Sequence, residues 1–215
     1  MKIAVIQASS QKEKNTLLYE CVVKAVRNQE SEVINFGVFP EEEITYSYIE
    51  IALMISLLLE SGAIDFAVTG CSSGQGMTLA CNSLPGVLCG YVANPADAFL
   101  FGRINDGNAV SFPLGLNFGW SGEINLQSTL DKLFDGPFGS GYPLKDAERK
   151  RADTRKLKEM NAATKRKLAE VLPKLDSELV LAAFQRKNVF DYVLKHGTNI
   201  ELLDLLKNNF IYDIN

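Results

Sequence analysis

The stretch VTGCSSGQGMTLACN, residues 68–82, contains the pattern that decides the fold of this chain. An apolar run ends at Gly70, Cys71 follows, and two serines and two glycines precede a segment with helical apolar spacing. This order is typical of a buried strand that passes through a glycine-rich turn into a helix. Backbone N–H groups at such a turn point toward one spot, and the helix N-terminus adds partial positive charge. We therefore predict an anion-binding turn with Cys71 at the strand end.

Cys71 has two interpretations from its surroundings. Backbone amides near a sulfur favour the thiolate, which would make Cys71 a base or a nucleophile. Free cysteine is also a common small buried hydrophobe, so packing alone explains it equally well. The turn is not a Walker A loop, because no lysine follows the glycines, and Leu79 replaces the third glycine of the dinucleotide fingerprint.

Outward from this turn, short apolar strands alternate with helical segments up to about residue 140. This alternation predicts an α/β fold, doubly wound in three layers around a five-stranded parallel, Rossmann-like sheet. Ligands of such sheets bind beyond the carboxyl ends of the strands, where Cys71 lies and where Ser9 follows the first strand. The strands are expected at residues 2–6, 32–37, 65–70, 87–92 and 108–114, and the helices at 16–29, 47–62, 77–86, 95–106 and 122–136.

The composition argues against several classes of protein. No apolar run reaches the about 18–20 residues that a membrane-spanning helix needs, and the N-terminus reads as a buried strand, not a signal peptide. The net charge of −4 gives no overall attraction to nucleic acid or anionic membrane, so neither is expected as a partner. Four cysteines without a CxxC pair and a single histidine argue against a zinc site and a disulfide framework. We expect no metal, no cofactor and a reduced, cytoplasmic setting.

The composition changes from Lys145 onward. Residues 145–172 hold ten Lys or Arg and five Asp or Glu, and three shorter helical patterns follow Pro173. We divide the chain into an α/β domain, residues 1–143, and a C-terminal helical extension, residues 144–215. Because acids are interspersed with bases, a solvated helix face or an arm across a partner subunit is favoured over RNA binding. Apolar positions expected to pack on the core or on a second subunit are Leu157, Leu168, Val171, Leu179 and Phe184.

Two stretches, GCSSGQGMTLACNSLPGVLCGYV at 70–92 and RINDGNAVSF at 103–112, resemble the ribose-5-phosphate isomerase B family. That family also includes the galactose-6-phosphate isomerase subunits. Tyr46 lies where the family has a tyrosine on the substrate side, and the resemblance covers about residues 1–143. The positions that match the family's motifs are Cys71, Gly74, Gly76, Ala80 and Asn82, with Ser73 in place of a threonine, and then Asn105, Asp106 and Asn108.

The resemblance implies aldose–ketose isomerisation through an enediol, in a homodimer or higher homo-oligomer with sites at the subunit interface. A base takes the proton from the carbon beside the carbonyl and returns it to the neighbouring carbon. In one branch of the family the loop cysteine is that base, and in another a glutamate after the second glycine, where this chain has Met77. The resemblance thus implies Cys71 as the base, Ser73 assisting proton movement on oxygen, and amides of 72–76 stabilising the enediolate. The implied substrate-binding residues are Ser9, Tyr46, Gly70, Ser72, Gly74, Gln75, Gly76, Asn82, Arg103, Asn105 and Asp106.

Departures from the family's pattern bear on the substrate. Ala8 and Ser9 stand where the family has Asp-His, and Ile104 replaces the histidine credited with ring opening. Residues 142–144 interrupt its arginine clamp for phosphate. Two explanations stay open, lost activity or an open-chain substrate without phosphate. Isomerases of 4-deoxy-5-keto-uronates in bacterial cytoplasm are similar to this family, and a keto-uronate is the favoured substrate. A phosphorylated pentose or hexose is the alternative, and a non-catalytic sugar-binding or RNA-binding relative is the alternative of another class.

Overall fold

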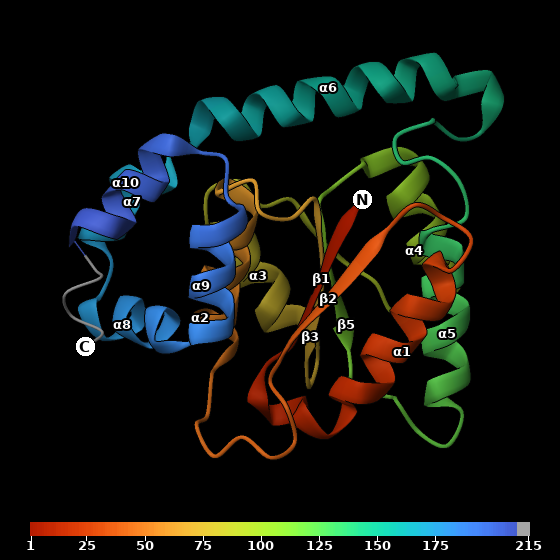
Figure 1. The fold of residues 1–215 in the computed structure, drawn as a ribbon. Helices are drawn as coiled ribbons and strands as arrows, with labels where there is room; N and C mark the ends of the chain where they lie inside the picture. Colours follow the sequence, from red (N-terminus) through yellow and green to blue (C-terminus); the bar gives the residue numbers. More distant parts are fainter. Residues whose placement is uncertain (210–215) are drawn as a thin grey trace.

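The computed structural model describes residues 1–209 and shows a five-stranded sheet with helices on both faces (Figure 1). Every strand pair is parallel, and the strand order is β2-β1-β3-β5-β4. The predicted fold class is confirmed. The strands are β1 (Lys2–Ile6), β2 (Glu32–Gly37), β3 (Phe66–Cys71), β4 (Cys89–Tyr91) and β5 (Ala109–Pro113).

Two apolar cores lie on the two faces of the sheet. One core joins the sheet to α1 (Asn15–Val26), α4 (Pro95–Leu100) and α5 (Gly122–Leu133). The other joins it to α2 (Tyr48–Glu60) and α3 (Gln75–Ser83). A 3-10 turn, Ser9–Lys14, precedes α1, and a π-helical turn, Phe101–Asn105, continues α4.

The helix α2 has no polar face along most of its length. Its start is fixed by a capping box, in which Ser47 Oγ accepts from the Glu50 N–H and the Glu50 carboxylate accepts from the Ser47 N–H. All eight residues from Ile51 to Leu58 are buried. A helix that is apolar all round must be covered on every side, and here the sheet covers one side and the C-terminal extension another.

From Leu168 onward, the helices of the extension share the core of α2. Leu168 and Phe184 are buried in this core as predicted, Val171 and Leu179 are half-buried, and Leu157 is 41% exposed. The boundary at residue 143 stays a prediction, and residues 210–215 of the predicted extension lie outside the described residues. Within residues 1–209, no helix combines the length and apolar character that crossing a membrane requires. The extension's elements are 3-10 Leu144–Asp146, α6 (Ala147–Thr164), α7 (Leu168–Val171), 3-10 Leu172–Lys174, α8 (Ser177–Gln185), α9 (Lys187–His196) and α10 (Ile200–Asn209).

Candidate active site

The connections after β1 and β3 leave the sheet toward opposite faces. After β1 the chain enters α1 on one face, and after β3 it enters α3 on the other. Ligands of open parallel sheets bind at such a divergence, beyond the carboxyl ends of the strands. The candidate site therefore lies beyond Ile6 and Cys71.

The glycine-rich turn holds Cys71 as the sequence predicted. Cys71 ends β3 and is 7% exposed, and the Gly74 N–H donates to its sulfur at 3.2 Å. Gly74 has φ +75°, and a Cβ there would lie 2.9 Å from the Phe112 carbonyl carbon and from the Pro113 nitrogen, so only glycine fits. The strand–turn–helix prediction is confirmed.

The first amides of α3 directly follow the cysteine turn. The N-cap residue of α3 is Gly74, which has no side chain to cap the helix, and the N–H groups of Gly76 and Met77 in its first turn have no intrahelical partner. The Gln75 N–H donates to Ser73 Oγ at 3.4 Å. Across the turn, the Ser72 carbonyl accepts from the Gly115 N–H at 2.9 Å. The turn therefore has N–H groups near Cys71 that are available to a ligand, whereas its Ser72 carbonyl already accepts a hydrogen bond from the loop after β5.

Ser9 and Tyr46 are joined to this turn by backbone hydrogen bonds. The Ser9 N–H donates to the Tyr46 carbonyl at 3.0 Å, and the Tyr46 N–H donates to Ser9 Oγ at 2.7 Å. The Ala8 N–H donates to the Gly70 carbonyl at 3.0 Å. The Tyr48 ring lies 3.4 Å from where a Cβ on Gly76 would stand. The structure thus brings Ser9, Tyr46 and Gly70 together with the cysteine turn.

A polar rim beside Ser72 was missed by the sequence reasoning. Gln11 Nε2 donates to Ser72 Oγ at 3.1 Å, and Lys14 Nζ donates to Gln11 Oε1 at 3.1 Å. Lys14 is half-buried, with its ammonium 4.5 Å from the Phe118 ring centroid, and no carboxylate of residues 1–209 forms an ion pair with it. Both residues follow β1 as Ser9 does, so the position of ligands beyond the carboxyl ends of the strands would have indicated them too.

Asn105 and Asp106 lie near the N-terminal ends of the parallel strands, whereas Cys71 lies at the carboxyl end of β3. They precede β5, in which Ala109 pairs with Ala67 and Pro113 pairs with Cys71. The steps from Ala109 to Pro113 alone span about 13 Å at about 3.3 Å per residue. Within one subunit, neither residue can share a site with Cys71.

Arg103 and Asp106, two predicted ligands at the N-terminal ends of the strands, make contacts with other parts of the fold. Arg103 is 5% exposed and donates to the carbonyls of Leu133 and Asp135 at the end of α5, so we leave it out of the proposed site. Asp106 pairs with Lys158 of α6.

Asn82 and Asn105 border one groove of about 420 Å³ that Tyr91 and Leu157 also line. The Asn82 amide is bonded on both sides to the backbone of Cys89, at 2.8 and 2.9 Å. Asn105 is exposed, and its side chain makes no hydrogen bond within residues 1–209. Asn82 therefore joins α3 to β4, whereas the Asn105 amide is available to a ligand or a second subunit.

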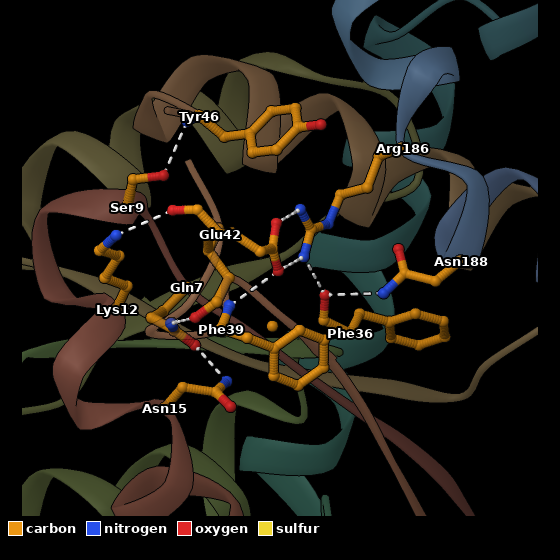
Figure 2. Close-up of polar contacts among 12 residues, drawn as sticks. Gln7, Ser9, Lys12, Asn15, Phe36, Phe39, Glu42, Tyr46, Arg186 and Asn188 are labelled. Carbon is orange, nitrogen blue, oxygen red and sulfur yellow. Dashed lines mark hydrogen bonds and ion pairs between the residues drawn. The ribbon is translucent and has the colours of Figure 1, made fainter. Parts of the chain in front are cut away.

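The loop between β2 and α2 contains a paired carboxylate, Glu42 (Figure 2). Both of its oxygens accept from the Arg186 guanidinium, and one also accepts from the Phe39 N–H at 2.8 Å. Burial opposes ionisation of Glu42, but the bonds from Arg186 and Phe39, with the charges of Arg186 and Lys12, outweigh it. The pKa of Glu42 therefore lies below its usual range.

Glu42→Gln is expected to make stability less dependent on acid pH. Because the folded pKa is below the unfolded one, the carboxylate stabilises the fold above the ordinary glutamate pKa of about 4.3. This stabilisation is lost as the pH falls through the folded pKa. In thermal unfolding, the free energy of unfolding of the variant should be about 1–3 kcal/mol lower than that of the wild type at pH 7. This difference should disappear in acid. Glu43→Gln, at an exposed neighbour, is the control. A gap that stays constant from pH 7 to pH 3 contradicts the assignment.

Comparison with known proteins places the chain in a family. A family model described as Ribose/Galactose Isomerase matches residues 5–126, more than half of the chain. The chain belongs to the ribose/galactose isomerase family. The resemblance seen in the sequence is thereby confirmed, and the cysteine turn and β5 both lie inside the matched residues. No curated protein matches the chain significantly.

Two solved structures match nearly the whole chain. One is a 4-deoxy-L-threo-5-hexosulose-uronate ketol-isomerase complexed with a tartrate, with 38% identity and a TM-score of 0.91, covering 96% of this chain and 98% of that one. The other is a ribose-5-phosphate isomerase of Vibrio parahaemolyticus, with 37% identity, a TM-score of 0.90 and the same coverage. Because the two similar proteins carry different substrate names, the names alone do not decide the substrate of this chain.

Shorter members of the fold lack a counterpart of part of this chain. The type B ribose 5-phosphate isomerase of Trypanosoma brucei is matched over 97% of its length but covers 74% of this chain, with 20% identity and a TM-score of 0.61. The two long relatives therefore match a part of this chain that this shorter member of the fold does not cover. Within the described residues, no group of three or more His, Cys, Asp or Glu side chains could hold a metal ion.

Proposed function

We propose that this chain is an aldose–ketose isomerase that acts through an enediol, with Cys71 as its base and an open-chain keto-uronate as its substrate. The substrate would be of the 4-deoxy-L-threo-5-hexosulose-uronate type. The observation that supports the chemistry best is the position of the Cys71 sulfur. It lies at a strand end, accepts the Gly74 N–H at 3.2 Å, and is followed by a helix whose Gly76 and Met77 N–H groups have no intrahelical partner.

The proposed reaction moves protons without an external oxidant. The Cys71 thiolate takes the proton from the hydroxyl-bearing carbon beside the aldehyde, and the electron pair forms the carbon–carbon double bond of the enediolate. The aldehyde oxygen gains the negative charge, which the amides of the turn stabilise. The proton on the neighbouring hydroxyl moves to that oxygen with the help of Ser73. The Cys71 thiol then returns its proton to the former aldehyde carbon, which gives the ketose.

The charged groups around the turn favour a carboxylate over a phosphate. Phosphate sites usually contain arginine forks, because bidentate charged hydrogen bonds offset the cost of desolvating a dianion. Arg149 and Arg151 lie on α6, where Arg149 pairs with Asp153 and Arg151 donates to the Ser140 carbonyl. The cation tied to the cysteine turn is Lys14, through Gln11. We assign to Lys14 the carboxylate of the substrate.

The substrate proposal predicts a clear order of specificity. The value of kcat/KM should be higher for the keto-uronate than for ribose 5-phosphate or a hexose 6-phosphate, because Ile104 cannot transfer a proton to open a ring. Lys14→Met should lower kcat/KM for the uronate about 10-fold or more, since it removes a charged contact. If a phosphosugar is the better substrate, the uronate assignment is wrong and the family's phosphorylated substrates apply.

The proposed site is completed by a second copy of the chain. Asn105 and Asp106 lie too far from Cys71 in one subunit, and the Asn105 amide is exposed beside a groove. In a homodimer, the partner would bring these two residues to the cysteine turn. All four cysteines are free thiols, and a reducing cytoplasm would keep Cys71 in the state that the reaction needs.

A further inference from the structure

Arg186 is a buried arginine that the proposed reaction does not use. It stands between α8 and α9 of the extension and is 4% exposed. Its guanidinium makes a fork with Glu42, with Nη2 to Oε1 at 2.8 Å and Nη1 to Oε2, and Nη2 also donates to the Phe36 carbonyl. Figure 2 shows the guanidinium enclosed by these groups on one side and the Tyr46 ring on another.

The fork fits its place closely. A Cβ on Gly37 would lie 2.5 Å from Arg186 Nη2 and 2.9 Å from Glu42 Oε1, so no other residue fits at the end of β2 without moving the pair. The Arg186 Nε is buried without a hydrogen-bond partner in the described residues. Burying such a pair costs desolvation, and a buried ion pair is weak evidence for stability. The Arg186–Glu42 pair is therefore better explained by the fixed geometry that it gives the loop than by stability.

Arg186 is connected to the cysteine turn through Tyr46. The guanidinium carbon lies 4.8 Å from the Tyr46 ring centroid, a cation–π contact. Tyr46 is 4% exposed and is bonded in both directions to Ser9. The residue before Ser9 donates to Gly70, which precedes Cys71. The fork on Glu42 and the contact on Tyr46 therefore hold the loop 38–47 against the strand ends that carry the cysteine.

The same loop is anchored on its other side by residues that follow β1. Lys12 Nζ donates to the Glu42 carbonyl at 2.8 Å, and Gln7 Nε2 donates to the Val38 carbonyl at 2.7 Å (Figure 2). Asn15 in turn donates to Gln7 Oε1 at 2.9 Å. These bonds fix the loop from within the α/β domain, whereas Arg186 is supplied by a helix pair far along the chain.

We propose that Arg186 is a positioning residue for the active site, through which the C-terminal extension fixes Tyr46 and the loop 38–47 beside the substrate. The proposal rests on the proposed function, and on the family resemblance for the position of Tyr46 on the substrate side. It gives the extension a task in catalysis besides covering α2. If Tyr46 and its loop are displaced, the rate falls even when the reacting groups are intact, because the substrate is no longer held in a productive orientation.

The test is a double-mutant cycle on activity, with Arg186→Lys and Tyr46→Ala. Arg186→Lys keeps the charge but removes the planar fork, and kcat/KM should fall about 10- to 100-fold. In the Tyr46→Ala background the same change should lower kcat/KM less than about 3-fold, because the side chain that Arg186 positions beside the substrate is already gone. Lys187→Arg, an exposed neighbour on the same turn, is the matched control and should change nothing. Full activity in Arg186→Lys, or effects of the two changes that simply multiply, would overturn the proposal.

Hydrogen exchange separates this proposal from the proposed function. In Arg186→Lys, the Tyr46 amide should exchange about 10-fold faster or more, and in Lys187→Arg it should not. If the wild type isomerises no sugar, the proposed function is wrong. The exchange rate of the Tyr46 amide then tests by itself whether Arg186 holds Tyr46 in place. An unchanged rate refutes it. If Arg186→Lys does not fold, Glu42→Asp keeps both charges, draws back the fork by one methylene, and is measured in the same way.

Discussion

Replacing Cys71 with alanine is expected to lower kcat by roughly 10²- to 10⁴-fold, the usual contribution of a positioned general base. The substrate should still bind, because the amides of the turn belong to the backbone. The fold should persist, since the side chain is small and its sulfur accepts from a single backbone N–H, that of Gly74. The measurement is kcat and KM with the substrate that the wild type prefers, together with a thermal unfolding curve.

Cys21→Ala is the matched control for this variant. Cys21 is also buried, but it lies on α1 in the other core, and burial raises the pKa of its thiol. It should retain full turnover. A Cys71→Ala enzyme with more than about a tenth of the wild-type kcat would remove Cys71 from the role of base, because a missing base costs at least about 100-fold.

Chains carrying Cys71→Ala and chains carrying Asn105→Ala should each be inactive alone and recover activity when they are produced together. In a mixed dimer, one site receives both altered residues and the other receives neither. Random assembly makes half of the dimers mixed, so about a quarter of the wild-type turnover should return. The measurement is the turnover of the co-purified mixture, with the share of mixed dimers found from two affinity tags.

The control for the shared site pairs Cys71→Ala with Ser73→Ala. Both residues belong to the same turn, so every site in the mixed dimer carries one defect and no recovery is expected. If Cys71→Ala with Asn105→Ala also shows no recovery while mixed dimers are present, Asn105 does not act on the partner's cysteine. Full activity of the Asn105→Ala chain by itself would lead to the same conclusion.

The fold and the cysteine turn could be predicted because their signals are local. Apolar alternation, Gly74 at a positive φ and the serines of the turn all lie within a few residues of one another. Pairings between distant residues leave no such signal. Glu42 and Arg186 are 144 positions apart, and each looks like an ordinary surface charge in its own stretch of sequence.

A matching motif did not predict the role of a side chain that can bind either a ligand or the protein's own backbone. Arg103 lies inside a stretch that resembles the family, which suggested a substrate ligand, but its guanidinium binds the carbonyls at the end of α5. A guanidinium has donors in several directions, so the sequence does not say which acceptor it meets. The roles of Asn105 and Asp106 stay predictions, because they depend on a second subunit.

The distance between Glu42 and Arg186 along the chain has a consequence for protein synthesis. At about 5–20 residues per second, the ribosome adds Arg186 roughly 7 to 29 s after Glu42. For most of that interval, from Glu60 until α8 begins at Ser177, the nascent chain contains the apolar helix α2 but not the helices α8 and α9 that cover it. A growing polypeptide therefore exposes this surface to chaperones and to other unfinished chains, and rare codons between residues 60 and 186 would lengthen the exposure.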